Sequence, residues 1–167
     1  GLSNLKNTPE ALRAQITPDV KKLWMDNGVM NDVEIMARYE IEMEEYVKKV
    51  QIEGRVLGDM ATNDIIPTAI TYQNRLIQNV QGLKDIFGKD FEKYATEQIE
   101  IIKDISRHIT EIKTNVDKMI EERKKANDLT DTREMAIAYC DNVKGKYFDI
   151  IRYHVDKLEL LVDDAFW

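Results

Sequence analysis

Residues 63–76, Asn-Asp-Ile-Ile-Pro-Thr-Ala-Ile-Thr-Tyr-Gln-Asn-Arg-Leu, decide the fold of this 167-residue chain. They lie in the middle of a nearly unbroken helical pattern that runs from Tyr39 to Gly88, and they place Pro67 within its apolar stripe. A proline inside a helix removes a backbone donor and clashes with the preceding turn, at a cost of about 3 kcal/mol. We therefore expect one long helix that is kinked at Pro67, with the bend serving the geometry of the molecule.

Apolar residues recur at spacings of three and four along three long segments, which is the pattern of helices that pack on one another. The first segment covers residues 32–87, the second covers 91–127, and the third starts at Asp131. The third seam is Ala136, Cys140, Val143, Tyr147, Ile151, His154, Leu158 and Leu161. No run alternates apolar and polar residues between turn residues, so no strand is expected.

Capping residues mark the ends of the expected helices. Thr8 and Thr17, each followed by proline and an acid, predict the N-caps of two short helices. Residues 27–28, Asn-Gly, close the second of these, because glycine readily adopts the left-handed conformation. Asn31 with Glu34 has the spacing of a capping box at the start of the first long helix.

The length of the first long segment decides how the helices pack. Residues 32–87 would span about 84 Å as a helix, whereas a compact domain of this size has a radius of gyration of about 15 Å. Short turns near 88–90 and 128–130 make neighbouring helices antiparallel. The predicted fold is all-α: an elongated antiparallel helical bundle of three long helices, the first kinked at Pro67, plus two short N-terminal helices.

The same pattern predicts the organisation of the chain. Residues 1–30 hold the two short helices, which we expect to pack on the projecting arm, residues 32 to about 50. Residues 31–167 form the long helical bundle. Phe166 and Trp167 follow a helix end without a glycine cap, so we expect two exposed aromatic rings and a C-terminal domain cut from a larger enzyme.

Composition excludes several classes of function. The net charge of −7 argues against nucleic-acid binding, which needs clustered cations on one face. The most basic run, residues 123–125, lies near a helix end, where cations favour the helix dipole. No apolar run approaches the roughly 20 residues that span a bilayer, and we recognise no secretory signal. With Cys140 as the single cysteine, a cytoplasmic protein without membrane contact is the simplest interpretation.

The two histidines are the first candidates for chemistry. His154 falls on the third seam, and His108 lies beside seam residues of the second. A di-metal carboxylate bundle needs Glu-x-x-His pairs, and neither histidine has a glutamate three residues before it. We expect both to be structural, with metal binding or phosphotransfer as the open alternatives.

Other motifs also favour structure over chemistry. Cys140 has no histidine at helical spacing and is expected to act as a small buried hydrophobe. The acidic run within residues 40–45 pairs with lysines four residues later, as a solvated helix face does. Residues 54–58, Gly-Arg-Val-Leu-Gly, lack the lysine of a phosphate loop. We therefore predict no catalytic, cofactor-binding or metal-ligating residue in this chain.

Two further features have structural and functional interpretations. Gly54, Gly58 and Ala61 share one side of the first long helix and favour a tight helix crossing, or a docking surface for another domain. Gln73, at a core position, needs hydrogen-bond partners if it is buried. It is a register device in the core, or a polar contact to another domain or subunit.

Several long motifs in order carry a resemblance to a known family. They are residues 37–42 (Ala-Arg-Tyr-Glu-Ile-Glu), 46–53, 65–74, 82–88, 123–127 and 152–159. Together they resemble the C-terminal helical domain of bacterial type III glutamine synthetase, from about residue 8 to the end. Asp64 departs from the family pattern, which would place a histidine there, and Gly54 stands where a larger residue or serine is more usual.

The resemblance implies a parent enzyme that joins ammonia to glutamate with ATP and Mg²⁺ or Mn²⁺, assembled as a dodecamer. It implies that the ATP-, metal- and glutamate-binding residues lie upstream, so none is expected here. We expect a noncatalytic domain that supports assembly or interdomain packing, with the catalytic domain of the same chain and neighbouring subunits as partners. The alternatives are a freestanding coiled-coil scaffold or regulatory module that binds helical partners, and a bundle enzyme with a metal site.

Overall fold

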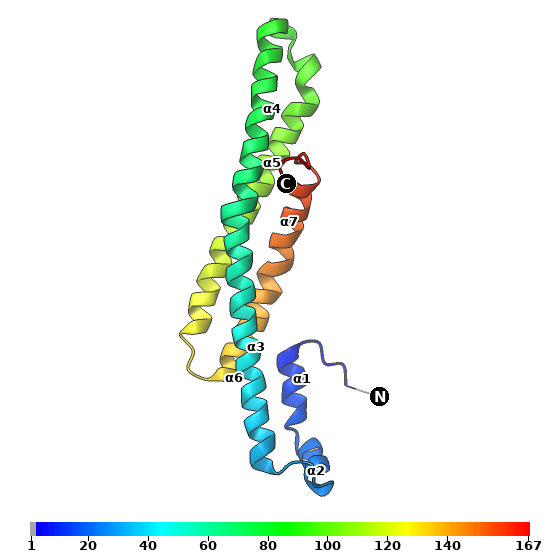
Figure 1. Ribbon diagram of the computed structural model, residues 1–167, viewed down its shortest axis with the longest axis vertical. Coiled ribbons are helices and arrows are strands. Elements are labelled where there is room, and N and C mark those ends of the chain that lie inside the picture. The colour runs from blue at the N-terminus through cyan, green and yellow to red at the C-terminus, as the bar shows by residue number, and fades with distance from the viewer. Residues whose placement is uncertain (1–2) are drawn as a thin grey trace. The chain divides into compact units, whose positions relative to one another are not determined.

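The fold is all-helical, as the apolar spacing predicts. The computed structural model describes residues 3–167, and no strand occurs in that part of the chain (Figure 1). Its contacts divide the chain into two compact units, each built from two stretches of sequence. One unit comprises Gly1–Arg55 with Met119–Lys146, and the other comprises Val56–Lys118 with Tyr147–Trp167.

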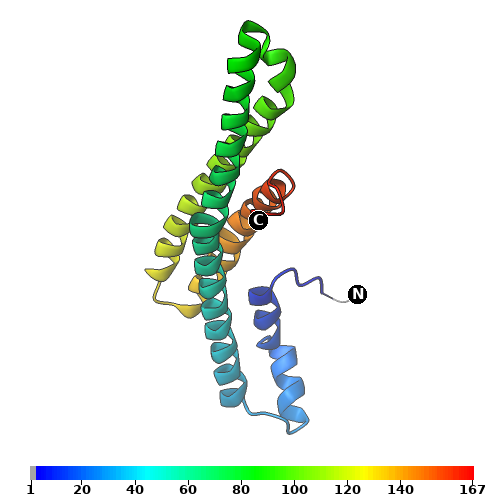
Figure 2. The same cartoon turned by 45° about the horizontal axis from the view of Figure 1, so that its top comes forward.

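The first unit packs two short helices and parts of three longer segments around one core. Its elements are α1 (Thr8–Gln15), α2 (Pro18–Asp26), the first part of α3 (Asp32–Met60), the last part of α5 (Glu92–Asn127), α6 (Thr132–Ala138) and most of the π-helical segment Tyr139–Phe148. Figures 1 and 2 show α1 and α2 beside the first part of α3. The core includes Ile35, Tyr39, Met43, Val47, Val50, Ala136, Tyr139 and Val143.

A polar bridge lies at the edge of this core. The Gln51 amide donates to Asn127 Oδ1 at 2.8 Å, and the hydroxyl of Tyr139 donates to the same oxygen. Because Tyr139 is fully buried, this bond satisfies a hydroxyl that would otherwise be desolvated without a partner. The bridge therefore fixes how α3, α5 and the π-helical segment meet in this unit.

The second unit is built around α4 (Ile66–Phe87), the first part of α5 and α7 (Asp149–Glu159). Its core includes Ala69, Ala95, Ile105, Ile112, Val116, Ile151 and Leu158. Gln73 donates to the Ile102 carbonyl at 2.9 Å and to the Ser106 hydroxyl at 2.6 Å. The Gln73 amide thus has its hydrogen-bond partners within the unit. This favours the interpretation that Gln73 fixes the register of α4 against α5 over that of a contact to another domain.

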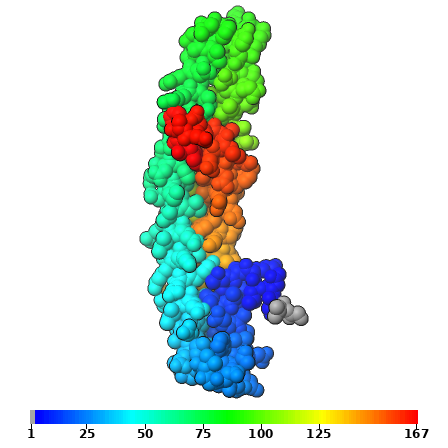
Figure 3. All heavy atoms as spheres, turned by 45° about the vertical axis from the view of Figure 1, so that its right-hand side comes forward, coloured from blue at the N-terminus to red at the C-terminus, as the bar shows by residue number. Residues whose placement is uncertain are grey.

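The end of the chain is folded back in this second unit. The segment after α7 lies against α4, where Figure 3 shows it in red. The Phe166 ring lies 5.9 Å from that of Tyr72, and the Arg75 guanidinium lies 4.3 Å from the centre of the Phe166 ring. The expectation of two dangling aromatic rings is therefore wrong for Phe166, while Trp167 is exposed.

Most predicted caps are confirmed. Asn31 accepts the Glu34 amide at 3.0 Å, and the Glu34 carboxylate accepts the Asn31 amide at 2.8 Å, which completes the capping box. Gly28 and Gly88 follow helix ends with φ of 64° and 55°, the region that favours glycine. The helix stops near 27–28 and at Gly88 thus follow from the sequence alone.

The predicted N-cap at Thr8 is wrong, whereas the one at Thr17 is confirmed in position but forms no side-chain capping bond. Asn7 caps α1 by accepting the Glu10 amide at 2.9 Å, and Thr8 is the first helical residue. Asn is a stronger cap than Thr, and a proline is tolerated anywhere in the first turn because those amides have no helical acceptor. Thr17 does precede α2, but its hydroxyl donates backward to the Ala14 carbonyl instead of capping α2.

The helical run before Pro67 contains a wide turn. Residues Ala61–Ile65 are π-helical, and the Ile66 amide donates to the Ala61 carbonyl, five residues back. Pro67 is the second residue of α4, and its side chain is exposed, so its expected place within the apolar stripe is wrong. The wide turn accommodates a residue that cannot donate and whose ring needs room beside the preceding turn.

A second π-helical segment, Tyr139–Phe148, was not expected from the sequence. The regular seam places Cys140 in the core, yet Tyr139 is fully buried and Cys140 is half-buried. A Cβ on Gly145 would lie 3.0 Å from the Cys140 carbonyl oxygen, five residues earlier. Glycine at this position therefore leaves room for the widened turn.

Replacing Pro67 by alanine should stabilise the protein. Pro67→Ala restores an amide donor and removes the ring, and we expect the free energy of unfolding to rise by about 1–3 kcal/mol. Urea unfolding followed by circular dichroism measures this. Gln78→Ala, at an exposed site in the same helix, is the control and should change stability little; a destabilised Pro67→Ala would contradict the proposed cost of the proline.

Gly82 and Gly145 should respond differently to replacement by alanine. In α4, nothing lies within 4 Å of the position that a methyl group on Gly82 would take, so Gly82→Ala should stabilise by about 0.5–1 kcal/mol. Gly145→Ala should lack this gain, because its methyl group presses on the Cys140 carbonyl. Equal stabilisation of the two variants in thermal unfolding would show that Gly145 is not needed for the wide turn.

Candidate functional site

The two histidines meet in the second unit. The Nδ1 atoms of His108 on α5 and His154 on α7 lie 2.8 Å apart, so one neutral ring donates to the other. Burial lowers the pKa of His108, and the charges of His154 and Arg107 lower it further, while Asp104 opposes them. The rings satisfy each other, which favours the structural interpretation of both. No sequence pattern indicates this pairing, because 46 residues separate them.

No metal site is apparent in the part of the chain that the structure describes. Residues 3–167 contain no group of three or more His, Cys, Asp or Glu side chains placed to hold a metal ion. A catalytic zinc site uses three protein ligands, and two histidines bonded to each other supply too few. The arrangement of His108 and His154 therefore offers no support for a bundle enzyme with a metal site.

Cys140 lies beside Tyr46 in the first unit. Burial raises the pKa of both groups, and the Tyr46 hydroxyl donates to the Cys140 sulfur. A raised thiol pKa keeps the sulfur protonated and a weak nucleophile. Cys140 is thus suited to packing rather than to nucleophilic chemistry.

The acidic run at residues 40–45 lies on a mostly exposed face of α3. Glu44 pairs with Lys48 at 3.3 Å, with both side chains more than half exposed. The expected partner pair, Glu45 with Lys49, is not formed among the described residues. Exposed pairs of this kind contribute at most about 1 kcal/mol each, so this surface is a solvated helix face.

Small residues in α3 and the turn after it are buried. Gly54 and Gly58 are both buried, and Ala61 is fully so. A docking surface would leave them accessible. Their burial favours the interpretation of a tight helix crossing.

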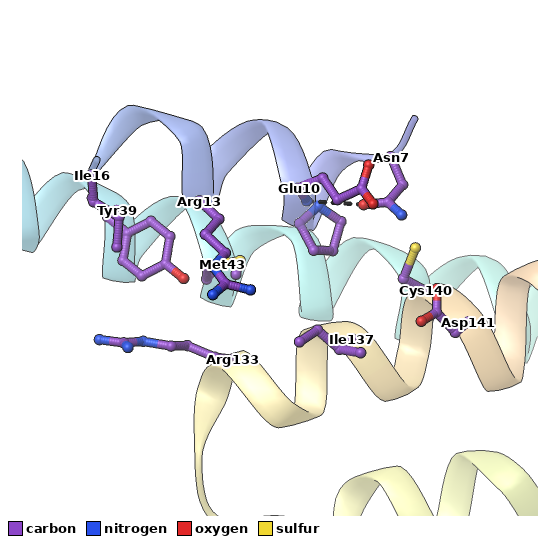
Figure 4. Close-up of a pocket in the computed structure, with 11 residues that line it drawn as sticks. Asn7, Glu10, Arg13, Ile16, Tyr39, Met43, Arg133, Ile137, Cys140 and Asp141 are labelled. Atoms are coloured by element: carbon purple, nitrogen blue, oxygen red, sulfur yellow. Dashed lines mark hydrogen bonds between the residues drawn. The ribbon is translucent and has the colours of Figure 1, made fainter. Parts of the chain in front are cut away.

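A cleft between α1, α3 and α6 is a concave site of the first unit. It has a volume of about 320 Å³ and lies within that unit (Figure 4). Its lining is mixed: Arg13, Arg133, Tyr39, Glu10, Asp141 and Asn7 are polar, and Met43, Ile137, Ile16 and Pro9 are apolar. No signal in the sequence indicates this cleft, because no periodic pattern joins α1 to a helix that begins more than 100 residues later.

A second feature of the first unit is a group of apolar side chains on α2, on the turn after it and at the start of α3. We call it the apolar surface of α2, and it comprises Leu23, Trp24, Met25, Val29 and Val33. All five side chains are exposed, and α2 contains no buried residue. The ion pair from Lys21 to Asp32, at 2.8 Å, joins α2 to the start of α3. A short helix that buries nothing gains little packing energy, so this surface is unusual for a folded helix.

Hydropathy gives no indication of a membrane span. No helix among residues 3–167 combines the length and the apolar character that crossing a bilayer requires.

The fold and these sites define a class: an all-helical domain with two mutually bonded histidines, an inert thiol and an uncovered apolar surface. The family model of the glutamine synthetase C-terminal domain matches residues 1–84. The chain belongs to this family, which confirms the resemblance seen in the sequence.

Relatives extend the match over the whole chain. A glutamine synthetase from Bacteroides fragilis is 40% identical over 168 residues, covering 100% of this chain and 23% of that protein. A glutamine synthetase from Butyrivibrio fibrisolvens is 26% identical over 99% of this chain, and a type-3 glutamine synthetase from Dictyostelium discoideum is 24% identical over all of it. The chain spans 23% of the length of each of these relatives.

The histidine pair predicts a pH dependence of stability. The pKa of His108 is lowered in the folded chain, so below about pH 6.5 an unfolded histidine takes up a proton that folded His108 resists. The contribution of His108 should therefore leave stability unchanged above that pH and lower it as the pH falls below about 6.5. Thermal unfolding measures this, and His108→Gln should flatten the slope. A melting temperature that rises as the pH drops over this range in the unmodified chain would contradict the lowered pKa.

Proposed function

We propose that this chain is a noncatalytic helical domain of a glutamine synthetase, and that it supports packing against the catalytic part and the assembly of subunits. The parent activity in this proposal is the ATP-dependent joining of ammonia to glutamate. Family membership supports it, as do relatives of which this chain spans only 23%. A cytoplasmic location belongs to the same proposal, since a lone protonated thiol suits a reducing compartment.

The observation that carries an assembly role is the apolar surface of α2. Five large apolar side chains within residues 23–33 remain exposed. Apolar residues scattered singly over a surface are ordinary, whereas a concentration of them marks a contact with another protein. In the relatives, three quarters of the polypeptide lies outside the region that this chain matches, and it is available as the partner.

We also propose an antiparallel arrangement of the long helices. In the second unit, Gln73 of α4 bonds Ser106 of α5, and Phe87 further along α4 stacks on Tyr94 near the start of α5, with ring centres 4.2 Å apart. As residue numbers rise along α4, those of their partners on α5 fall. This order supports an antiparallel hairpin of α4 and α5 with the short connection Gly88–Asp90 at its end.

The catalytic residues of the parent enzyme are placed outside this chain in our proposal. The two best candidates for chemistry are His108 and Cys140. His108 bonds to His154, and Cys140, which lines the cleft between α1, α3 and α6, has a thiol whose pKa is raised by burial, so it is a weak nucleophile. The alternative of a freestanding scaffold receives no specific support from the geometry, whereas the match to part of longer synthetases supports a domain role.

The assembly role is tested on the full-length protein with the double variant Leu23→Ser/Trp24→Ser. Because α2 buries no residue, we expect unchanged helicity by circular dichroism. We expect the oligomer to dissociate at subunit concentrations at least about tenfold higher, which corresponds to a loss of about 1.4 kcal/mol. Sedimentation velocity over a dilution series measures this.

Ile86→Ser is the control, because Ile86 is an apolar residue near the end of α4 that is even more exposed than Leu23 and Trp24. It should leave the oligomer unchanged. If the double variant assembles as the unmodified protein does and keeps its thermal stability, the apolar surface of α2 is not an interface.

A further inference from the structure

We propose that the cleft between α1, α3 and α6 binds a small organic acid, with its acid group held by Arg13, Arg133 and the hydroxyl of Tyr39. This inference is independent of the assembly role, since the cleft and the apolar surface of α2 share no residue. The cleft volume of about 320 Å³ falls within the range of small-molecule sites.

Tyr39 supplies the most specific observation. The side chain is only 2% exposed, yet it lines the cleft. Among residues 3–167 the hydroxyl has no protein hydrogen-bond partner, and its oxygen is open to the cleft instead of being sealed in the core. Figure 4 shows the hydroxyl directed along the cleft. A ligand oxygen in the cleft would give this donor its missing partner.

Two arginines share the cleft with that hydroxyl. Arg13 extends from α1 and Arg133 from α6, and both reach the space beside Tyr39 (Figure 4). The Arg133 guanidinium lies 5.4 Å from the centre of the Tyr39 ring, a cation–π contact that orients it. Neither arginine forms an ion pair within the described part of the chain, and Glu10, one turn before Arg13, instead accepts the Lys6 amide.

A carboxylate or phosphate would change the energetics of this group. Neither guanidinium has a carboxylate partner among residues 3–167, so a bound anion would supply each with a charge-assisted hydrogen bond. Arginine suits this role because its planar fork of donors matches a carboxylate. The group Arg13, Arg133 and Tyr39 is therefore an anion-binding end of the cleft.

The rest of the lining defines the ligand further. Met43 and Ile137 offer apolar contacts in the middle of the cleft, and Glu10 and Asp141 lie at the end away from Arg133 (Figure 4). A second acid group at that end would meet like charge, whereas an amine would meet opposite charge. The site thus fits a molecule with an acid group, an apolar chain and an amine at its far end.

Three six-carbon probes test this on the full-length protein by isothermal titration calorimetry at constant ionic strength. They are 6-aminohexanoate, hexanoate and adipate, which share a chain length and differ at one end. We expect saturable binding of 6-aminohexanoate, weaker binding of hexanoate, and the weakest binding of adipate. Absence of saturable binding by all three, or any order in which 6-aminohexanoate is not first, overturns the proposal.

Substitutions locate the site. Arg13→Gln and Arg133→Gln should each weaken binding of 6-aminohexanoate about tenfold, in line with the strength of charge-assisted bonds. Tyr39→Phe, which keeps the ring and its contact with Arg133, should weaken it about threefold to tenfold. Lys22→Gln removes the same charge from α2, outside the cleft, and should change nothing. Equal losses in Lys22→Gln and Arg133→Gln would show unspecific attraction and overturn the assignment.

Discussion

The structure depends on keeping the apolar faces of long helical segments turned toward the core. Over these lengths a regular α-helix alone does not hold one face in that direction. Two wide turns meet this constraint. At Ala61–Ile65 and at Tyr139–Phe148 the backbone hydrogen bonds join residues five apart instead of four. The turn that follows therefore presents a different set of side chains to the core. The first wide turn leads directly into α4, whose second residue is Pro67, and it leaves room for a residue that cannot donate. The second places the large ring of Tyr139 in the core and leaves Cys140 at its edge.

Each unit then uses a small polar group to fix its register. In the first unit the shared acceptor is Asn127, which receives Gln51 and Tyr139; in the second, Gln73 reaches both a carbonyl and a hydroxyl of α5. Apolar packing alone tolerates sliding of one helix along another, because leucine and isoleucine contacts have no direction. A buried donor left without its acceptor is destabilising by about 1–3 kcal/mol, so each group disfavours a shifted register. These residues are thus structural even though isolated polar residues in a core resemble functional ones in sequence.

These features belong to a member of the glutamine synthetase C-terminal domain family. The groups that could perform chemistry are occupied with one another: His108 bonds His154, and Tyr46 bonds Cys140. The features without such mutual satisfaction lie elsewhere, at the apolar surface of α2 and in the cleft beside Tyr39. One is apolar and open, which suits a protein partner, and the other is concave and charged, which suits a small acid. The apolar character of the first feature therefore suits assembly, and the charge of the second suits ligand binding.

The sequence by itself determined the helical class, the capping box at Asn31, the stops at Gly28 and Gly88, and the family, because these depend on spacing and on local backbone preferences. It placed Pro67 within the apolar stripe, and it missed the second wide turn, because a π turn changes the period on which such patterns rely. The pairing of His108 with His154 and the meeting of Arg13 with Arg133 were decided only by tertiary structure. Local sequence does not encode which distant helices become neighbours; that choice follows from burying several apolar faces at once.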